Sequence, residues 1–178
     1  MSTRHVYADE SKRGRYLLVA VTIEDPDAAR KAITSLILPG QRRLHMVRER
    51  DSRRRLILST LVQLGLEAVI YDAGRDYRED RQARGACLTA LATDLLGRDT
   101  RLVIEEDESE LHADRLALYQ ATYGTRSAGG LAYVHDRASH DQLLAIPDAI
   151  AWSWPQGGDW RRRVGPLVTA VRDVGNRP

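Results

Sequence analysis

Acidic side chains stand at the ends of several segments that have the composition of β-strands. Asp9 and Glu10 end the first such segment, Asp72 ends a later one, and Glu105 and Glu106 end another. Carboxylates at a strand end are costly unless water, a cation or a metal compensates them. If neighbouring strands bring these ends together, their mutual repulsion demands a divalent cation or raised pKa values. The first chemical hypothesis is therefore a carboxylate cluster at one edge of a sheet.

Asp148 is an acid inside an otherwise apolar segment that contains Ile146, Ala149 and Ile150. A lone carboxylate in such a segment would be expensive to bury, so we expect Asp148 to join the strand-end acids. Oxygen-only ligation suits Mg²⁺ or Mn²⁺ rather than zinc. Two such ions about 4 Å apart can activate a water and stabilise the leaving oxygen in phosphodiester hydrolysis.

In this interpretation Asp9 bridges the metal ions, and Asp148 together with Glu105 or Asp72 completes the ligand shell. Glu10 is either a ligand or a neighbour of one. A histidine at position 45 can shuttle a proton or contact the leaving phosphate, and a packed histidine is an equal alternative. The candidate catalytic residues are Asp9, Glu10, His45, Asp72, Glu105 and Asp148.

The elements that must position these residues follow from local patterns. An N-terminal strand ending in the acids, a polar turn with Gly14, and the apolar run Tyr16–Ile23 predict a β-hairpin. Hydrophobic spacing, caps and breakers then predict helices over 25–38, 50–64, 76–96 and 109–123, and a further helix that presents Asp148. They also predict strands over 66–72, 101–108 and 131–134 and a short strand near 41–46. A loop is expected over 127–130. Strands alternating with helices indicate an α/β fold, whose active sites lie at the carboxyl ends of strands.

Alternation along the strands narrows the choice of acids. Asp9 falls on the same face as Tyr7, whereas Glu105 and Glu106 point to opposite faces, so at most one of the latter two enters the site. The charged first half of helix 76–96 is interpreted as a solvated face. In its apolar second half Cys87 is expected in the core.

Composition bounds the class of protein. With 178 residues the chain fits one domain, 1–178, with a sizeable core. No apolar stretch is long enough for a membrane span and no secretory signal is evident, so we expect a cytoplasmic protein with no membrane partner. The formal net charge of +2 argues neither for nor against nucleic acid. Nearly all positive charge is arginine, which binds phosphate well, but we favour the codon usage of a GC-rich genome as the explanation.

The C-terminal part combines Trp152, Trp154 and Trp160 with the run Arg161–Arg163. These residues can form a platform for base stacking and phosphate binding. We favour the interpretation that the tryptophans cover an edge of the core.

Two motifs carry a family resemblance. Tyr7-Ala8-Asp9-Glu10-Ser11 resembles the Tyr-x-Asp-Glu-Ser opening of an uncharacterised family in the ribonuclease H-like superfamily, and the segment 143–152 resembles that family's late Leu-Gln-x-Ala-Asp-x-x-Ala motif. The resemblance implies an α/β ribonuclease H-like mixed sheet, with an N-terminal antiparallel hairpin and then parallel strands, flanked by helices. It also implies a divalent-metal nuclease site, and on that basis Glu105 is preferred to Glu106, giving Asp9, Glu105 and Asp148 as metal ligands.

This sequence departs from the family pattern at three positions. Ala145 stands where the family has Gln, Pro147 precedes the acid, and Arg43 replaces the acid of a Glu-x-His motif that here reads Arg43-Leu44-His45. An arginine in place of a carboxylate subtracts a ligand and adds a positive charge.

Three functions therefore remain open. The first is a Mg²⁺- or Mn²⁺-dependent nuclease acting on DNA, RNA or a hybrid. The second is a catalytically weak or inactive ribonuclease H-like module that binds nucleic acid or a protein partner. The third is a small-molecule phosphohydrolase using the same acids. The oligomeric state is also open, a homodimer included.

Overall fold

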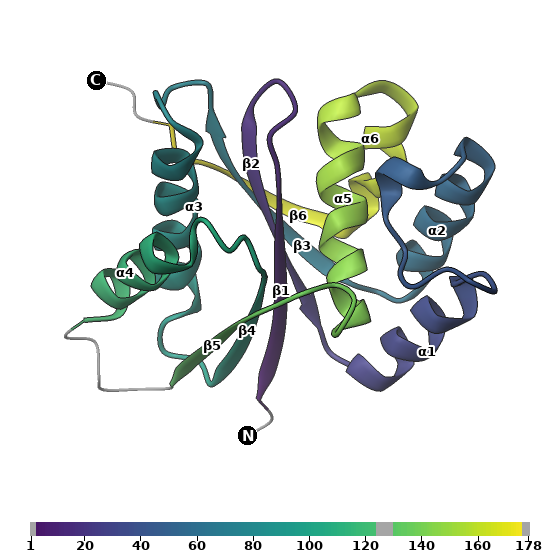
Figure 1. Cartoon of the computed structure of the whole chain (residues 1–178), viewed down its shortest axis with the longest axis horizontal. Helices are drawn as coiled ribbons and strands as arrows, with labels where there is room; N and C mark the ends of the chain where they lie inside the picture. Colours follow the sequence, from purple (N-terminus) through teal and green to yellow (C-terminus); the bar gives the residue numbers. More distant parts are fainter. Residues whose placement is uncertain (1–2, 124–129, 176–178) are drawn as a thin grey trace.

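The computed structural model describes residues 3–123 and 130–175, which form one six-stranded sheet with helices on both faces (Figure 1). The strands are β1 Arg4–Ser11, β2 Tyr16–Ile23, β3 Glu67–Gly74, β4 Thr100–Glu105, β5 Leu131–Asp136 and β6 Val168–Asp173. The helices are α1 Pro26–Leu36, α2 Asp51–Gln63, α3 Asp80–Leu95, α4 Leu111–Thr122, α5 Ala145–Gln156 and α6 Gly158–Val164, with short 3-10 helices η1 Met46–Arg48, η2 Gln142–Leu144 and η3 Gly165–Leu167.

The sheet is mixed, with the strand order β5-β4-β1-β2-β3-β6. β2 pairs antiparallel with both β1 and β3, whereas β1 with β4, β4 with β5 and β3 with β6 are parallel pairs. The structure therefore confirms the predicted mixed sheet, with an antiparallel N-terminal hairpin and parallel strand pairs. The acidic ends of β1, β3 and β4 all point to the same edge of the sheet, because these three strands run in the same direction.

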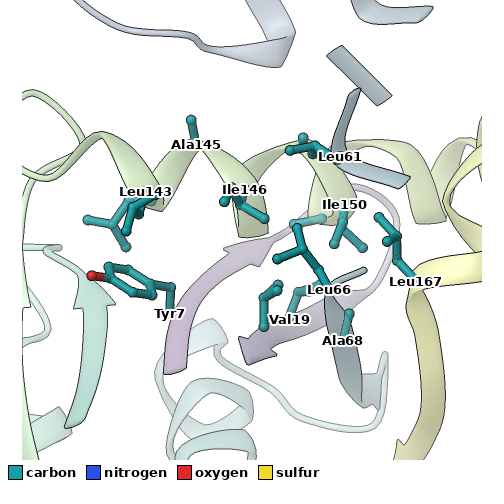
Figure 2. Packing of buried hydrophobic residues seen from close by; sticks show 14 of the residues in the cluster. Tyr7, Val19, Leu61, Leu66, Ala68, Leu143, Ala145, Ile146, Ile150 and Leu167 are labelled. Carbon is teal, nitrogen blue, oxygen red and sulfur yellow. The ribbon is translucent and has the colours of Figure 1, made fainter. Parts of the chain in front are cut away.

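Side chains of the central strands alternate between two hydrophobic layers, because successive residues of a strand point to opposite faces. On one face Tyr7 and Val19 join the side chains of α5 and α2, as Figure 2 shows, and on the other Ala8 and Leu18 pack against α3. In Figure 1 helices α3 and α4 cover one face, and α1, α2, α5 and α6 cover the other. Odd-numbered and even-numbered residues of β1 therefore pack against different helices.

Local signals account for the boundaries of several elements. The Asp25 carboxylate caps α1 by accepting a hydrogen bond from the Ala28 amide at 2.9 Å, and Pro26 occupies the first turn, where no amide donor is required. Gly14 adopts φ 72°, a backbone conformation that favours glycine, in the turn between β1 and β2. This turn sends β2 back along β1 and leaves Asp9 and Glu10 near the end of the hairpin.

Some expectations about the elements are wrong. The sequence does not predict β6, so the segment 131–134 is not the last strand of the chain. No strand forms over 41–46, where irregular backbone leads into η1, and α3 begins at Asp80 rather than near residue 76. The predicted loop 127–130 lies almost wholly outside the described residues. β6 is an edge strand whose side chains are mostly exposed, so it lacks the hydrophobic alternation that identifies a strand in a sequence.

No described helix is both long and apolar enough to cross a bilayer. Cys87 is fully buried on α3, as expected, and burial raises the pKa of its thiol to about 12.

Candidate active site

A cavity of about 780 Å³ opens at the carboxyl ends of β1 and β4, against α5. Its lining includes five of the six predicted catalytic residues, which come from β1, β4, α5 and the segment before η1: Asp9, Glu10, His45, Glu105 and Asp148. Positions far apart in the sequence therefore meet in one hollow, as the carboxylate hypothesis requires.

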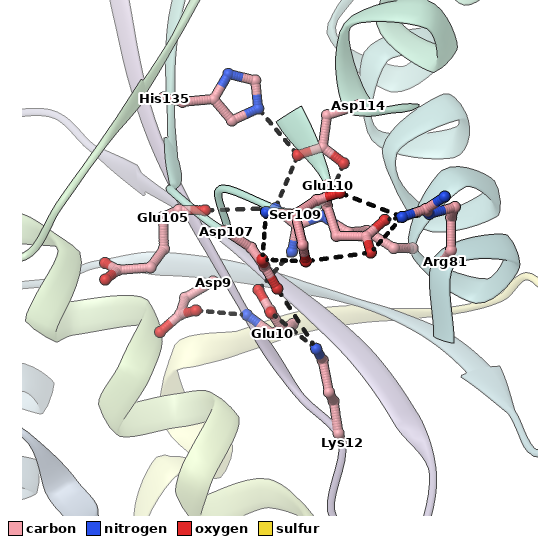
Figure 3. Close-up of polar contacts among 11 residues, drawn as sticks. Asp9, Glu10, Lys12, Arg81, Glu105, Asp107, Ser109, Glu110, Asp114 and His135 are labelled. Carbon is pink, nitrogen blue, oxygen red and sulfur yellow. Dashed lines mark hydrogen bonds and ion pairs between the residues drawn. The ribbon is translucent and has the colours of Figure 1, made fainter. Parts of the chain in front are cut away.

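Asp9 and Glu105 are adjacent because β1 and β4 are parallel neighbours in matching register. Ala8 pairs with Ile104, and each candidate acid is the next residue along its strand. Tyr7 and Val103 belong to the hydrophobic layer that faces α5. Each acid lies two residues further along its strand, so its side chain points to the same face of the sheet. Figure 3 shows both side chains on the side of the sheet occupied by α5, while Glu10 points to the other side.

Asp148 enters the cavity from the first turn of α5, where the helix dipole favours an acid. Its Oδ2 accepts a hydrogen bond from the Met46 amide at 3.0 Å, which connects α5 to η1. Burial raises the pKa of this carboxyl, although the Met46 amide and the nearby His45 and Arg43 oppose that shift. Pro147 fits the helix because amides of the first turn have no intrahelical acceptor.

Asp9 is the most perturbed acid of the cavity. Burial, and then the negative charges of Glu10, Asp148 and Glu105, raise its pKa well above the usual range. The Glu10 amide, which donates to Asp9 Oδ1 at 2.8 Å, offsets this only in part. The electrostatic field at this position therefore favours a proton or a cation on the Asp9 carboxyl group.

Glu105 has one satisfied and one unsatisfied oxygen. Arg43 Nη1 lies 3.6 Å from Oε1, while the buried Oε2 has no hydrogen-bond partner. Burial raises the pKa of Glu105, and the backbone amide of Ala138 and then the charge of Arg43 oppose the shift. Glu106 does not line this cavity and binds Arg137 at 3.0 Å, so only one of the two adjacent acids enters the site, as alternation predicted. Of the two adjacent acids, Glu105 is the one that the fold directs into the cavity with Asp9 and Asp148.

Glu10 lines the cavity but is held from the opposite face of the sheet. Arg84 Nη1 donates to its Oε2 at 2.7 Å, and Lys12 Nζ lies 3.8 Å from Oε1. Because both oxygens face cations of the protein, Glu10 is the least available of the five carboxylate and imidazole groups for an added ion.

Asp72 does not reach the cavity. It lies on β3, separated from β1 by β2, and Arg15 binds it with nitrogen–oxygen distances of 2.5 and 3.0 Å. Two strand spacings amount to roughly 10 Å, so the shared direction and face of β1 and β3 do not bring the two acids into contact. The predicted role of Asp72 at the site has no geometric support.

The cavity also holds two polar groups that find no partner in the described structure. The buried Nδ1 of His45 and the buried Nε2 of Gln156 make no hydrogen bond, like Oε2 of Glu105. Buried polar atoms are usually paired with protein, water or ligand. Three residues of this cavity therefore carry a polar atom that a water or a polar ligand would satisfy.

A divalent cation suits the chemistry of this donor set. Asp9, Glu105 and Asp148 offer carboxylate oxygens, the ligands that Mg²⁺ and Mn²⁺ prefer, and the raised pKa values and the free Glu105 oxygen mark uncompensated negative charge. Within residues 3–123 and 130–175, however, no three acidic, histidine or cysteine side chains are already arranged to hold a metal ion. Binding an ion would require rotation of these side chains.

Sequence reasoning missed a buried ionic network behind the site. Arg84 is 2% exposed and binds both oxygens of Asp114 at 2.7 and 2.8 Å. His135 lies 2.9 Å from the same carboxylate, as Figure 3 shows. The expected solvated face of this helix is thus wrong at Arg84. Its position three and four residues before Cys87 and Leu88 places it on the buried side, and that spacing was visible in the sequence.

The cavity lining extends beyond the predicted catalytic residues and includes Arg54, Trp152, Gln156 and Trp160. The tryptophans also pack against the hydrophobic layer under α5, so their expected role as cover for the core is confirmed. Trp152 follows Asp148 by four residues, which for a helix means the same face.

No known protein family model matches the chain, and no curated protein sequence matches it significantly.

Proposed function

We propose that this protein is a ribonuclease H-like nuclease that hydrolyses phosphodiester bonds of nucleic acid with Mg²⁺ or Mn²⁺. The observation that carries the proposal is the meeting of Asp9, Glu105 and Asp148 in one cavity at the carboxyl ends of two parallel strands. The mixed sheet with its N-terminal hairpin, and the acid of the last long helix lying over β1, agree with the family resemblance.

The three acids have distinct surroundings that fit a shared cation site. Asp9 experiences the negative charges of both Asp148 and Glu105, so it would be the ligand shared by the metal ions. Asp148 keeps one oxygen on the Met46 amide, which fixes its orientation. Glu105 contributes the unpaired Oε2. When bound, divalent ions supply an activated water and stabilise the leaving oxygen.

Basic groups of the cavity suit a phosphate-containing substrate. Lys12 and Arg13, in the turn after β1, line the same cavity as the acids, and both are exposed. Cations at the rim attract a phosphodiester that the carboxylates alone would repel. His45 also lines the cavity, and an imidazole there can exchange a proton with a reacting oxygen.

One observation favours the second function, a module that binds nucleic acid with little catalysis. Arg43 stands 3.6 Å from Glu105 and compensates part of the charge that a metal would otherwise neutralise. Ala145, in contrast, is buried in the hydrophobic layer and does not line the cavity, so the absent glutamine removes no cavity group.

The decisive experiment is cleavage of labelled DNA, RNA and hybrid substrates with Mg²⁺, with Mn²⁺ and with EDTA. Wild-type protein should cut at least one substrate only with a divalent ion, and Asp9→Asn and Asp148→Asn should abolish cutting while circular dichroism shows a folded protein. Binding with a steep salt dependence and no cleavage would favour the module, and absence of both would reject each nucleic-acid function.

Two matched controls separate the site from acids in general. Glu105→Gln should abolish cleavage, whereas Glu106→Gln, one residue away on the other face, should retain it. Asp72→Asn likewise changes a strand-end acid on the same edge but outside the cavity, and it should retain cleavage. Equal losses in all three variants would contradict the assignment of the site.

A further inference from the structure

The cavity continues beyond the acids along one face of α5. Asp148, Trp152 and Gln156 follow one another at intervals of four residues and all line it. With a rise of 1.5 Å per residue, these side chains are spaced roughly 6 Å apart along the helix. The cavity therefore has an acidic end at Asp148 and an aromatic and amide end at Trp152 and Gln156.

The aromatic end is held rigidly. The guanidinium of Arg54 lies 4.3 Å from the centre of the Trp152 ring, and Trp160 meets that ring edge to face with centroids 5.3 Å apart. Arg54 itself donates to the Met46 and Val47 carbonyls at 2.8 and 3.0 Å. A preorganised planar surface binds a flat ligand without a large loss of side-chain freedom.

Gln156 adds a hydrogen-bonding group beside these rings. Its Nε2 is buried and has no partner in the described structure. A carboxamide offers both donors and an acceptor, which is the pattern displayed on the edges of nucleobases. Arg54 is the cation at this end of the cavity, and its guanidinium already donates to the Met46 and Val47 carbonyls and to Asp51.

We propose that Trp152, Trp160 and Gln156 form a binding site for an unpaired nucleobase next to the reacting phosphodiester, so that the preferred substrate is single-stranded. This inference rests on the proposed function, because that function identifies nucleic acid as the ligand. A base within a duplex has both faces stacked and its pairing edge occupied, so it cannot meet the rings and the amide together. Aromatic side chains stack with every base, whereas the Gln156 amide would favour the bases whose edges it can hydrogen-bond.

Fluorescence anisotropy with labelled single-stranded oligonucleotides in EDTA tests the inference without cleavage. Moving one abasic position along the oligonucleotide should weaken wild-type binding about fivefold to a hundredfold at one site, as expected for loss of a stacked base. Trp152→Ala should remove that dependence on the abasic position. Gln156→Leu, a smaller change of shape, should weaken binding about three- to tenfold and alter preference among bases.

Matched control residues lie on α5 and α2. Trp154 also belongs to α5 and packs against the core, but its ring stacks with Arg161 and it does not line the cavity. Trp154→Ala should preserve the abasic dependence, and so should Gln63→Leu at the exposed end of α2. Trp152→Phe keeps an aromatic ring and should bind better than Trp152→Ala, which separates stacking from a loss of folding.

The outcomes distinguish this inference from the nuclease proposal. Metal-dependent cleavage with equal binding of duplex, single-stranded and abasic substrates would overturn the base site and leave the nuclease standing. Base-dependent single-strand binding without cleavage under any divalent ion would uphold the base site and overturn the nuclease. Absence of detectable single-strand binding would overturn the base site whatever the cleavage assay gives.

Discussion

Arg84 of α3 donates to the Glu10 carboxylate at 2.7 Å and so connects a buried helix side chain to the end of β1. The same guanidinium donates to the Glu105 carbonyl oxygen at 3.3 Å. One buried cation therefore holds both strand ends that carry the candidate acids. Asp9 and the Glu105 side chain point to the other face, which leaves them available to a ligand.

The Arg84 network should be a major source of stability. Replacing Arg84 by Leu leaves Asp114, which is 2% exposed, without its guanidinium partner, and loss of one member of a buried pair costs about 3–5 kcal/mol. Urea denaturation should show this loss. Arg81 lies one turn earlier and pairs with Glu110 in the same way but is exposed, so Arg81→Leu should change stability little. Similar losses in both variants would contradict the burial argument.

The ionised Asp9 carboxylate should lower the free energy of unfolding of the metal-free protein at neutral pH. Its pKa is raised in the fold above the ordinary 3.8, so the folded state binds the proton more tightly than the unfolded chain. The resulting stabilisation is complete below about pH 4 and is lost as the pH rises through the folded-state pKa. Asp9→Asn, which cannot ionise, should therefore melt several degrees higher than wild type at pH 8 in EDTA.

The advantage of Asp9→Asn should shrink steadily as the pH is lowered towards 4. Asp72→Asn is the control, because it removes an acid bound to Arg15 and should not stabilise the protein. A wild-type protein that is more stable than Asp9→Asn at pH 8 without metal would refute the electrostatic description of the cavity.

Divalent ions should stabilise the wild-type protein. Binding to the folded state alone adds about 2.7 kcal/mol when the ion is at 100 times its Kd, which corresponds to a rise in Tm of about 5–10 °C for a chain of this size. Differential scanning calorimetry with Mg²⁺ or Mn²⁺ measures the shift. Asp148→Asn should lose most of it and Asp72→Asn should keep it. An equal shift in both variants would mean that the ion binds elsewhere.

Arg43 should weaken metal binding and strengthen substrate binding. Arg43→Gln removes the cation 3.6 Å from Glu105, so the Mg²⁺ concentration needed for half-maximal cleavage should fall by up to about fivefold, the usual limit for an exposed pair. If Arg43 also contacts a phosphate, the slope of log K against log salt should decrease by about one. Arg137→Gln, which frees the neighbouring Glu106 instead, should change neither quantity.

The proposed metal ligands Asp9 and Asp148 should affect cleavage more strongly than their neighbour Arg43. Since outer partners of a metal site are commonly worth about 10- to 100-fold in activity, Asp9→Asn and Asp148→Asn are each expected to lose more than about 100-fold in kcat. Steady-state cleavage measures the loss. If either variant retains cleavage within about tenfold of wild type while remaining dependent on a divalent ion, that residue is not a ligand.

Several features follow from the sequence because local physics decides them. Alternation puts Asp9 on the same face of its strand as Tyr7, and it puts Glu105 and Glu106 on opposite faces of theirs, so at most one of these two enters the site. The apolar context of Asp148 marked it as an acid in need of compensation. Helix caps and glycine breakers placed most element boundaries near their observed positions.

The order of the strands was decided only by tertiary structure. β4 pairs with β1, while β2 separates β1 from β3, so Glu105 enters the cavity and Asp72 binds Arg15. Strand order depends on pairing between distant segments, and nothing in the local pattern of β3 or β4 encodes which of them lies beside β1. The same holds for Arg84, whose partners Glu10 and Asp114 come from other elements, and for Gln156, whose neighbours are set by the packing of α5 and α6.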